Sequence, residues 1–373
     1  MLFALLTLVC VGCGAQPQQR EIPAPTAEQL AFIVKDAPVS RERLYTAIAP
    51  LFDDPEMAET RALIVMKDGR IIAERYARPY HENTRFISWS MAKTITATLI
   101  GFLVSDGRLV LDDPAPVPAW QRPGDPRGLI TLRQLLQMSS GLDHEETGEV
   151  EGRSIYDADT SKLLFLEGAG DMAAYAEARP LEAPPGSMFE YSTATSVILA
   201  DIMTRVLTSS DDPTIRRDAA WRFMRGRLFE PMGMDSAYPE FDAHGTFIGG
   251  SIFSATARDY AKFGEFLRNR GARKGAQHLP VSWFAFMLKS SPNDAAYGAH
   301  VWLNQRRPEG RNPVLFPDIG PPGIFAALGH LGQYVIVSPR QRLTIVRLGK
   351  TQDDKEQAVT QQLGKIVELF PLS

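Results

Sequence analysis

The distribution of β-like segments constrains the fold most, because these segments occur at both ends of the chain. Near the N-terminus, residues 61–77 contain two β-rich runs that flank Asp68-Gly69, a strong signal for a tight hairpin turn. Near the C-terminus, the β-like runs are 297–303, 324–327, 333–337 and 343–348. This order predicts an α/β (α+β) fold in which both chain ends build one antiparallel sheet, flanked by helices and interrupted by a mostly helical insertion.

Helical patterns dominate the region between these strands. The clearest helix begins at Ser90 and ends at Asp106-Gly107, with apolar residues at helical spacing. Other helices are predicted over 131–138, 199–207, 221–228, 257–270 and 355–369. No linker-like segment divides this pattern, so we predict a single domain over residues 41–373.

The composition excludes several functional classes. Hydrophobic residues make up 44% of the chain, charged residues 23%, and the net charge is −4, which is typical of a soluble globular protein without a nucleic-acid partner. The six histidines are scattered. His144-Glu145-Glu146 is the most tempting metal-binding group, and we interpret it as a solvated loop. We therefore predict no metal and no cofactor.

The N-terminal segment resembles an export signal. Residues 1–13 are apolar and uncharged, and Val11-Gly12-Cys13 resembles the end of a bacterial lipoprotein signal, with Cys13 as the lipidated residue. Cys10 stands where leucine or a similar residue is usual. Residues 14–40 are predicted to be a tether. These features predict an exported, periplasmic protein that contacts the membrane only through an N-terminal lipid anchor; a simple cleaved signal is the alternative.

Ser90 and Lys93 form a candidate nucleophile pair at the start of the predicted helix. Residues i and i+3 share one face of a helix, so the two side chains would lie together. A serine hydroxyl becomes a good nucleophile when a neighbouring base takes its proton. Burial lowers the pKa of a lysine, and a partly neutral Lys93 could accept the Ser90 proton. Standing alone, the pattern is better explained by a helix-start serine followed by a solvated lysine.

Two further segments supply candidate site residues. Tyr191 follows a Pro-Gly turn and precedes a helix, and a tyrosine beside a lysine could relay a proton to a leaving group. The segment 329–333, Gly-His-Leu-Gly-Gln, opens a predicted strand, where glycines allow a substrate to approach the backbone. Considered singly, Tyr191 could equally be a core tyrosine and His330 a structural histidine.

The order and spacing of these three segments resemble those of the serine β-lactamase and penicillin-binding-protein superfamily. Within that superfamily, the chain is similar to the class C β-lactamase-related hydrolases, over roughly residues 40 to 370. This group includes D-alanyl-D-alanine carboxypeptidases, esterases and 6-aminohexanoate-dimer hydrolases, and the segments around Tyr191 and Gly332 look nearest to the last of these. The resemblance implies a β-lactamase-like fold and a serine hydrolase.

The same resemblance implies roles for individual residues. Ser90 would attack a carbonyl and form an acyl-enzyme, while Lys93 and Tyr191 shuttle the proton. The backbone N–H groups of Ser90 and Gln333 would hold the oxyanion. Which of Lys93 and Tyr191 is the formal base stays open, because they would titrate as a coupled pair.

Two departures from the lactamase pattern bear on the substrate. Thr193 stands in the place of an asparagine and cannot offer both an amide donor and an acceptor. His330 stands in the place of a lysine and is mostly neutral at pH 7. With Gly332, these are the predicted substrate-binding residues. We therefore predict a small-molecule ester or amide substrate; the alternatives are a D-alanyl-D-alanine carboxypeptidase or weak class C-like β-lactamase, and a non-catalytic lipoprotein that binds cell-wall peptides.

Overall fold

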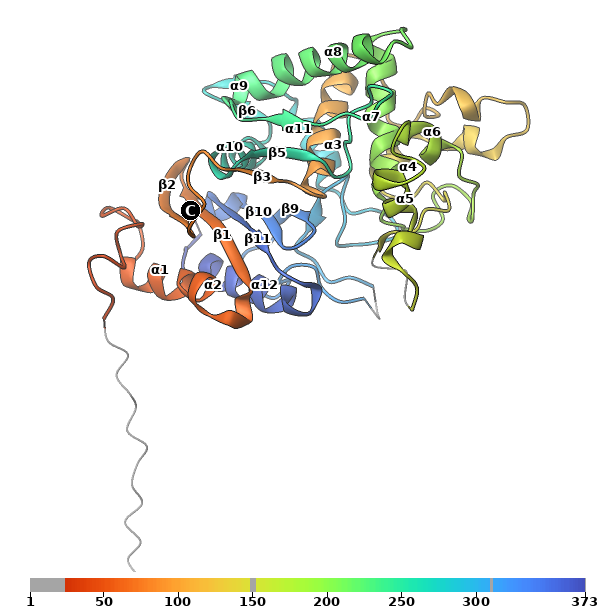
Figure 1. Cartoon of the computed structure of the whole chain (residues 1–373). Helices are drawn as coiled ribbons and strands as arrows, with labels where there is room; N and C mark the ends of the chain where they lie inside the picture. The colour runs from red at the N-terminus through yellow and green to blue at the C-terminus, as the bar shows by residue number, and fades with distance from the viewer. Residues whose placement is uncertain (1–23, 148–151, 309–310, 373) are drawn as a thin grey trace, which may run out of the picture.

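A six-stranded antiparallel sheet forms the centre of the structure, a computed structural model that describes residues 24–147, 152–308 and 311–372. Its strand order is β2-β1-β11-β10-β9-β8. The strands are β1 (Glu59–Lys67), β2 (Arg70–Tyr76), β8 (Trp302–Leu303), β9 (Phe325–Gly329), β10 (Gln333–Ser338) and β11 (Leu343–Lys350). Every pair of neighbouring strands is antiparallel, and β1 from one chain end pairs with β11 from the other. The predicted sheet is therefore confirmed (Figure 1).

Turn chemistry explains why β1 and β2 form a hairpin. Lys67 pairs with Arg70, which leaves Asp68 and Gly69 as the two loop residues. Both have positive φ angles, 55° and 79°, as a type I′ turn requires. Asp tolerates this left-handed conformation and Gly adopts it without steric cost, so the sequence Asp-Gly sets the register of the hairpin.

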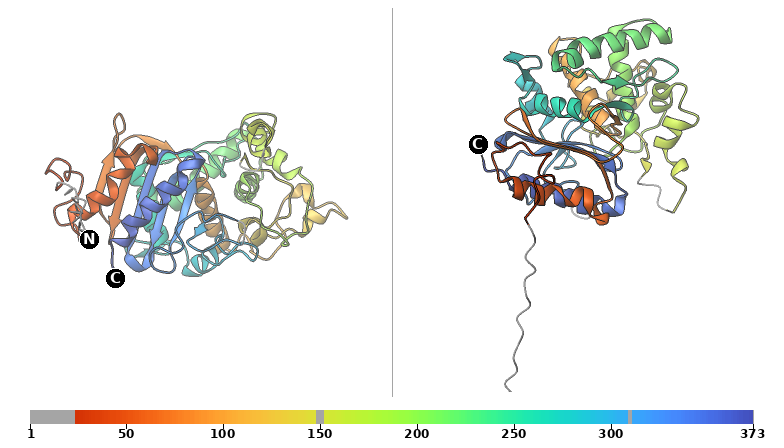
Figure 2. Two further views of the ribbon diagram at one scale, coloured as in Figure 1. Left: turned by 90° about the horizontal axis from the view of Figure 1, so that it is seen from below. Right: turned by 60° about the vertical axis from the view of Figure 1, so that its left-hand side comes forward.

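Helices cover both faces of the sheet. One face carries α1 (Arg41–Ile48), α2 (Pro50–Asp53) and α12 (Asp353–Glu368), and the other carries α3 (Met91–Ser105) and α10 (Ala257–Arg268) (Figures 1 and 2). Buried apolar side chains fill both interfaces: Leu63 and Ile345 belong to the layer under α12, and Ile64 and Val346 to the layer under α3. The alternation of neighbouring residues between the two layers is the period of two that a strand imposes.

The insertion between the two halves of the sheet is mostly helical and packs around α3. Its helices are α4 (Leu132–Leu136), α5 (Asp159–Phe165), α6 (Met172–Glu177), α7 (Thr193–Leu207), α8 (Pro213–Met224), α9 (Glu230–Met232) and α11 (Val281–Met287). Short strands accompany them: β3 (Arg85–Ile87), β4 (Tyr238–Pro239) and β5 (Phe253–Thr256) form one sheet, and β6 (Ala272–Arg273) pairs with β7 (Ala276–Gln277). Buried α3 and α7 pack against each other, which brings their N-terminal ends together.

Several boundaries differ from those predicted: α7 begins at Thr193 instead of residue 199, and α8 spans Pro213–Met224 instead of 221–228. The β-like run 297–303 is a strand only at its end, because Gly298 N–H donates to the carbonyl of Val301 and closes a turn. The tether predicted over 14–40 is also wrong in its later part. Leu30 and Ile33 are buried in the core, and Val34 N–H donates to the Ile72 carbonyl, so this segment extends the edge of the sheet.

The predicted signal and the lipidation site at Cys13 lie outside the described residues. Within the described ranges, none of the helices combines the length and apolar character needed to cross a bilayer.

Candidate active site

Ser90 and Lys93 meet at the N-terminal end of α3, as the sequence predicts. Ser90 is the residue at which the helix begins, with φ −62° and ψ −8°, and its side chain does not cap the helix. Its hydroxyl is therefore available, and the Nζ atom of Lys93 lies 3.0 Å from its Oγ atom. Backbone N–H groups at a helix start have no intrahelical partner, so they can stabilise negative charge that develops near Ser90.

Lys93 is buried, and three oxygen atoms surround its Nζ atom. Besides Ser90 Oγ, these are Thr193 Oγ1 and the carbonyl oxygen of Gly250, each at 2.8 Å. A neutral amine has two N–H donors and one lone pair. Since the Gly250 carbonyl can only accept, a neutral Lys93 that donates to Gly250 and Thr193 directs its lone pair at the Ser90 hydroxyl. Burial lowers the pKa of Lys93 to about 8, so roughly a tenth of it is neutral at pH 7.

Tyr191 completes the cluster from the segment that leads into α7. Its side chain hydrogen-bonds with Ser90, and Lys93 Nζ lies 4.8 Å from the centre of its ring. The ring packs edge-on against Tyr297, at 5.9 Å between centroids, and beside Trp302 at 5.5 Å. Burial raises the pKa of Tyr191, and the charge of Glu146 raises it further, so this phenol stays protonated near neutral pH.

The loop that contains His144 and Glu146 lies against this cluster, and its interpretation as a solvated loop is wrong. His144 is buried, with Nδ1 3.1 Å from Ser192 Oγ and Nε2 3.1 Å from the Ala176 carbonyl. Glu146 accepts a hydrogen bond from the backbone N–H of Thr193. Residue pattern alone could not find these roles, because the loop meets α7 only through the tertiary fold. Among the described residues, no group of three or more His, Cys, Asp or Glu side chains could hold a metal ion.

Thr193 and His330 occupy different parts of the site. Thr193 is buried, and its hydroxyl accepts from Lys93, so it supports the lysine rather than facing a substrate. His330 is exposed, and its ring lies edge-on to Trp89 at 5.6 Å between centroids. Because Trp89 directly precedes Ser90 in the chain, this contact places His330 at the rim of the site.

Gln333, the residue predicted to supply an oxyanion donor, belongs to the interior of the central sheet. It lies on β10, which β9 separates from the edge of the sheet, and its buried side chain donates to the Gly349 carbonyl at 2.8 Å. Gly329 on β9 is the residue that meets the catalytic segment: a Cβ atom there would lie 2.1 Å from the Ser88 carbonyl oxygen. Gln333 is the cross-strand partner of Gly329, and it is Gly329 on β9 whose backbone approaches Ser88.

Gly332 has a structural role instead of the predicted contact with substrate. Its φ angle of 74° belongs to the turn between β9 and β10. Its carbonyl accepts a hydrogen bond of 2.7 Å from the buried Arg347, and a Cβ atom at Gly332 would lie 2.6 Å from that guanidinium. The residue is glycine because the turn needs the left-handed conformation and because Arg347 approaches the backbone.

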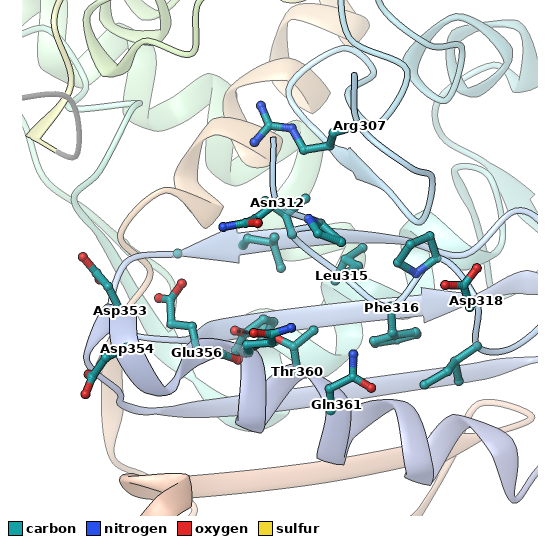
Figure 3. A pocket seen from close by; sticks show the side chains of 18 residues that line it. Arg307, Asn312, Leu315, Phe316, Asp318, Asp353, Asp354, Glu356, Thr360 and Gln361 are labelled. Carbon is teal, nitrogen blue, oxygen red and sulfur yellow. Dashed lines mark hydrogen bonds between the residues drawn. The ribbon is translucent and has the colours of Figure 1, made fainter. Parts of the chain in front are cut away.

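A pocket of about 620 Å³ lies beside the site, on the face of the sheet that α12 covers. Figure 3 shows Asp353, Asp354 and Glu356 at one end and Arg307 above the loop that closes it. Ser90, Lys93 and Tyr191 do not line it. Arg307 connects the two regions, since its guanidinium lies 5.3 Å from the ring centre of Trp302, which packs beside Tyr191.

Comparison with known families agrees with this geometry. The model of the family described as "Beta-lactamase" matches residues 54–366, which include every strand of the central sheet and all three residues of the cluster. The chain belongs to the beta-lactamase family. The β-lactamase-like fold and the serine hydrolase class predicted from the sequence are therefore confirmed.

Proteins similar to this chain include a 6-aminohexanoate-dimer hydrolase and an esterase. The chain is 24% identical over 344 residues to the 6-aminohexanoate-dimer hydrolase of Paenarthrobacter ureafaciens, a match that covers 90% of this chain and 81% of that protein. It is 33% identical over 177 residues to Esterase EstB of Burkholderia gladioli, covering 44% of this chain and 42% of the esterase. The structure of a family VIII carboxylesterase has the same fold, with a TM-score of 0.62, 15% identity and coverage of 87% of this chain and 96% of that one.

Proposed function

We propose that this member of the beta-lactamase family hydrolyses small esters or amides through an acyl-enzyme on Ser90. The contact of 3.0 Å between the buried Lys93 and Ser90 carries the proposal. Relatives named as a 6-aminohexanoate-dimer hydrolase and as an esterase support the substrate class.

Lys93 is the proton acceptor in this proposal. Its lowered pKa supplies a neutral fraction near pH 7, whereas the raised pKa of Tyr191 keeps the phenol protonated. In acylation, Ser90 Oγ bonds to the carbonyl carbon while its proton passes to Lys93 Nζ. Tyr191 then donates a proton to the departing alcohol or amine and regains one from the protonated Lys93. Attack by water, with its proton taken by the same pair, releases the acid and restores Ser90.

The oxyanion is held by the Ser90 N–H and by a backbone N–H from the end of β9. Gly329, rather than Gln333, is the residue that packs on the backbone next to Ser90. Beyond residue 326, β9 has β10 on one side only, because β8 pairs with Phe325 and Ala326. The other edge of 327–329 therefore pairs with none of the strands that the structure describes, which leaves strand N–H groups for a substrate carbonyl.

An activity-based fluorophosphonate probe tests the nucleophile directly. We expect labelling of the wild-type protein at Ser90 and loss of labelling in Ser90→Ala. An unlabelled wild-type protein would favour the non-catalytic binding protein. Rates on p-nitrophenyl acetate and butyrate, compared with nitrocefin and a D-alanyl-D-alanine peptide, then separate an esterase from a weak β-lactamase or carboxypeptidase.

We also propose that the protein is exported and anchored through lipid on Cys13. The apolar segment that ends at Cys13 supports this location. Metabolic labelling with radioactive palmitate tests it: label should enter the wild-type protein and be absent from Cys13→Ser, and an unlabelled wild-type protein in a membrane-free periplasmic fraction contradicts the anchor.

A further inference from the structure

A carboxylate, Glu146, stands beside the cluster of Ser90, Lys93 and Tyr191 on the loop between α4 and α5. We propose that Glu146 is a positioning residue that holds the start of α7 in place and sets the pH range in which Lys93 accepts the Ser90 proton. The inference rests on the roles of Ser90 and Lys93 in the proposed function.

A chain of three hydrogen bonds connects Glu146 to the nucleophile. The carboxylate accepts from the backbone N–H of Thr193, the hydroxyl of Thr193 accepts from Lys93 at 2.8 Å, and Lys93 Nζ lies 3.0 Å from Ser90 Oγ. Thr193 is the first residue of α7, where the helix dipole favours a negative charge. Glu146 therefore holds Thr193 in place, and the hydroxyl of Thr193 in turn positions Lys93.

His144 fixes the same loop at a second point. Its Nε2–H donates to the Ala176 carbonyl, so Nδ1 accepts from the Ser192 hydroxyl, which in turn caps α7 by accepting from Thr195 N–H at 3.1 Å. Burial lowers the pKa of His144 to about 4, so the side chain is neutral in the working range and contributes geometry rather than charge. Because the loop is held at both His144 and Glu146, the Glu146 carboxylate keeps a fixed position relative to Lys93.

The charged and titratable groups that face Lys93 determine whether electrostatics raise or lower its pKa. Tyr191 and Tyr297 are protonated phenols because burial raises the pKa of each. His300 is a neutral imidazole because burial lowers its pKa to about 3. His330 is exposed at the rim. Glu146 is the charged group that acts on Lys93, and its carboxylate raises the lysine pKa against the larger effect of burial.

Removing the charge of Glu146 changes the pKa of the proton acceptor in a defined direction. Without the carboxylate, the pKa of Lys93 falls, so the neutral amine is available at lower pH. The pKa of Tyr191 falls as well, because Glu146 raises it. The expected direction is therefore the same whichever of the two groups takes the Ser90 proton.

The test compares pH profiles of kcat/KM for p-nitrophenyl butyrate in three variants. Glu146→Gln keeps an oxygen for Thr193 N–H and removes the charge, so its acidic limb should move to lower pH by about half to one unit. Glu146→Asp keeps the charge and should leave the limb near its wild-type position. Glu145→Gln is the matched control, because it removes a neighbouring carboxylate that binds Arg153 instead, and its limb should not move.

Each result supports or overturns the inference. An unmoved limb in Glu146→Gln, or equal shifts in Glu146→Gln and Glu145→Gln, overturns it, because a merely structural carboxylate would not move the profile. If Glu146→Gln does not fold, a limb in Glu146→Asp displaced to lower pH by half a unit or more overturns it, and an unmoved limb supports it. A wild-type protein that neither turns over ester nor labels at Ser90 refutes the proposed function instead, whereas an active wild type with an unchanged Glu146→Gln profile refutes only this inference.

Discussion

The Nζ atom of Lys93 lies 3.0 Å from the Oγ atom of Ser90, within the first turn of α3. The lysine is buried, and its other two partners are oxygen atoms of Thr193 and Gly250. A buried amine with a lowered pKa, aimed at a hydroxyl, is the arrangement in which a lysine can act as a base.

Ser90→Ala should abolish ester turnover, because the covalent nucleophile is lost. Stopped-flow or plate assays with p-nitrophenyl butyrate measure the effect. Ser187→Ala is the matched control: this exposed serine lies close in sequence to Tyr191 but donates only to the Pro184 carbonyl. Turnover by Ser90→Ala within tenfold of the control would remove Ser90 from the mechanism.

Lys93→Ala should lower kcat at least a hundredfold, since a positioned acid–base residue contributes a factor of about 10² to 10⁴ to the rate. The protein should remain folded enough for circular dichroism to show native helix content. Steady-state kinetics alongside thermal unfolding separate the two effects. A variant that unfolds normally and turns over at near wild-type rate would exclude Lys93 as the proton acceptor.

The rate should rise with pH through the titration of Lys93. Below its pKa of about 8 the amine is protonated and cannot accept the Ser90 proton, so kcat/KM should fall about tenfold per pH unit. Above it the rate should level off, because the raised pKa of Tyr191 keeps that phenol protonated. A kcat/KM profile from pH 5 to 10 measures this, and a rate that declines between pH 6 and 9 contradicts it.

Gly329→Ala should reduce kcat more than tenfold, because the new methyl group would lie 2.1 Å from the Ser88 carbonyl and must push β9 away from Ser90. A displaced donor of an oxyanion hole no longer stabilises the oxyanion, and one such donor contributes a factor of about 10² to 10³ to kcat. Gly170→Ala is the control, since a Cβ atom there meets nothing within 4 Å. Equal kinetics of the two variants would show that β9 does not border the reacting carbonyl.

Arg347→Met should destabilise the fold by about 3 kcal/mol, because it removes the donors that satisfy buried oxygen atoms. The guanidinium donates to the carbonyl of Gly332 at 2.7 Å and to the hydroxyls of Thr60 and Thr351 at 3.0 and 2.8 Å. Arg342→Met, at an exposed ion pair, should change stability by less than about 0.5 kcal/mol. Urea unfolding compares them, and equal midpoints would contradict the structural role of Arg347.

Local chemistry accounts for what the sequence alone could predict. Asp68-Gly69 forms the hairpin turn, and Thr131 caps α4 through a hydrogen bond from Gln134 N–H. Ser90 and Lys93 meet because they are three positions apart at the start of a helix. These features follow from neighbours in the chain, so their residue types suffice to predict them.

The tertiary structure decided everything that joins distant segments. Thr193 lies 100 residues from Lys93 and Gly250 lies 157 away, and neither contact has a sequence pattern of its own. The pairing of distant strands brought Gly329 on β9 beside Ser88, with Gln333 opposite it on β10. Glu146 likewise entered the site because its loop packs on α7. Spacing along the chain predicted the contact between Ser90 and Lys93, because it is local to one helical turn, while packing decided which distant groups surround that contact.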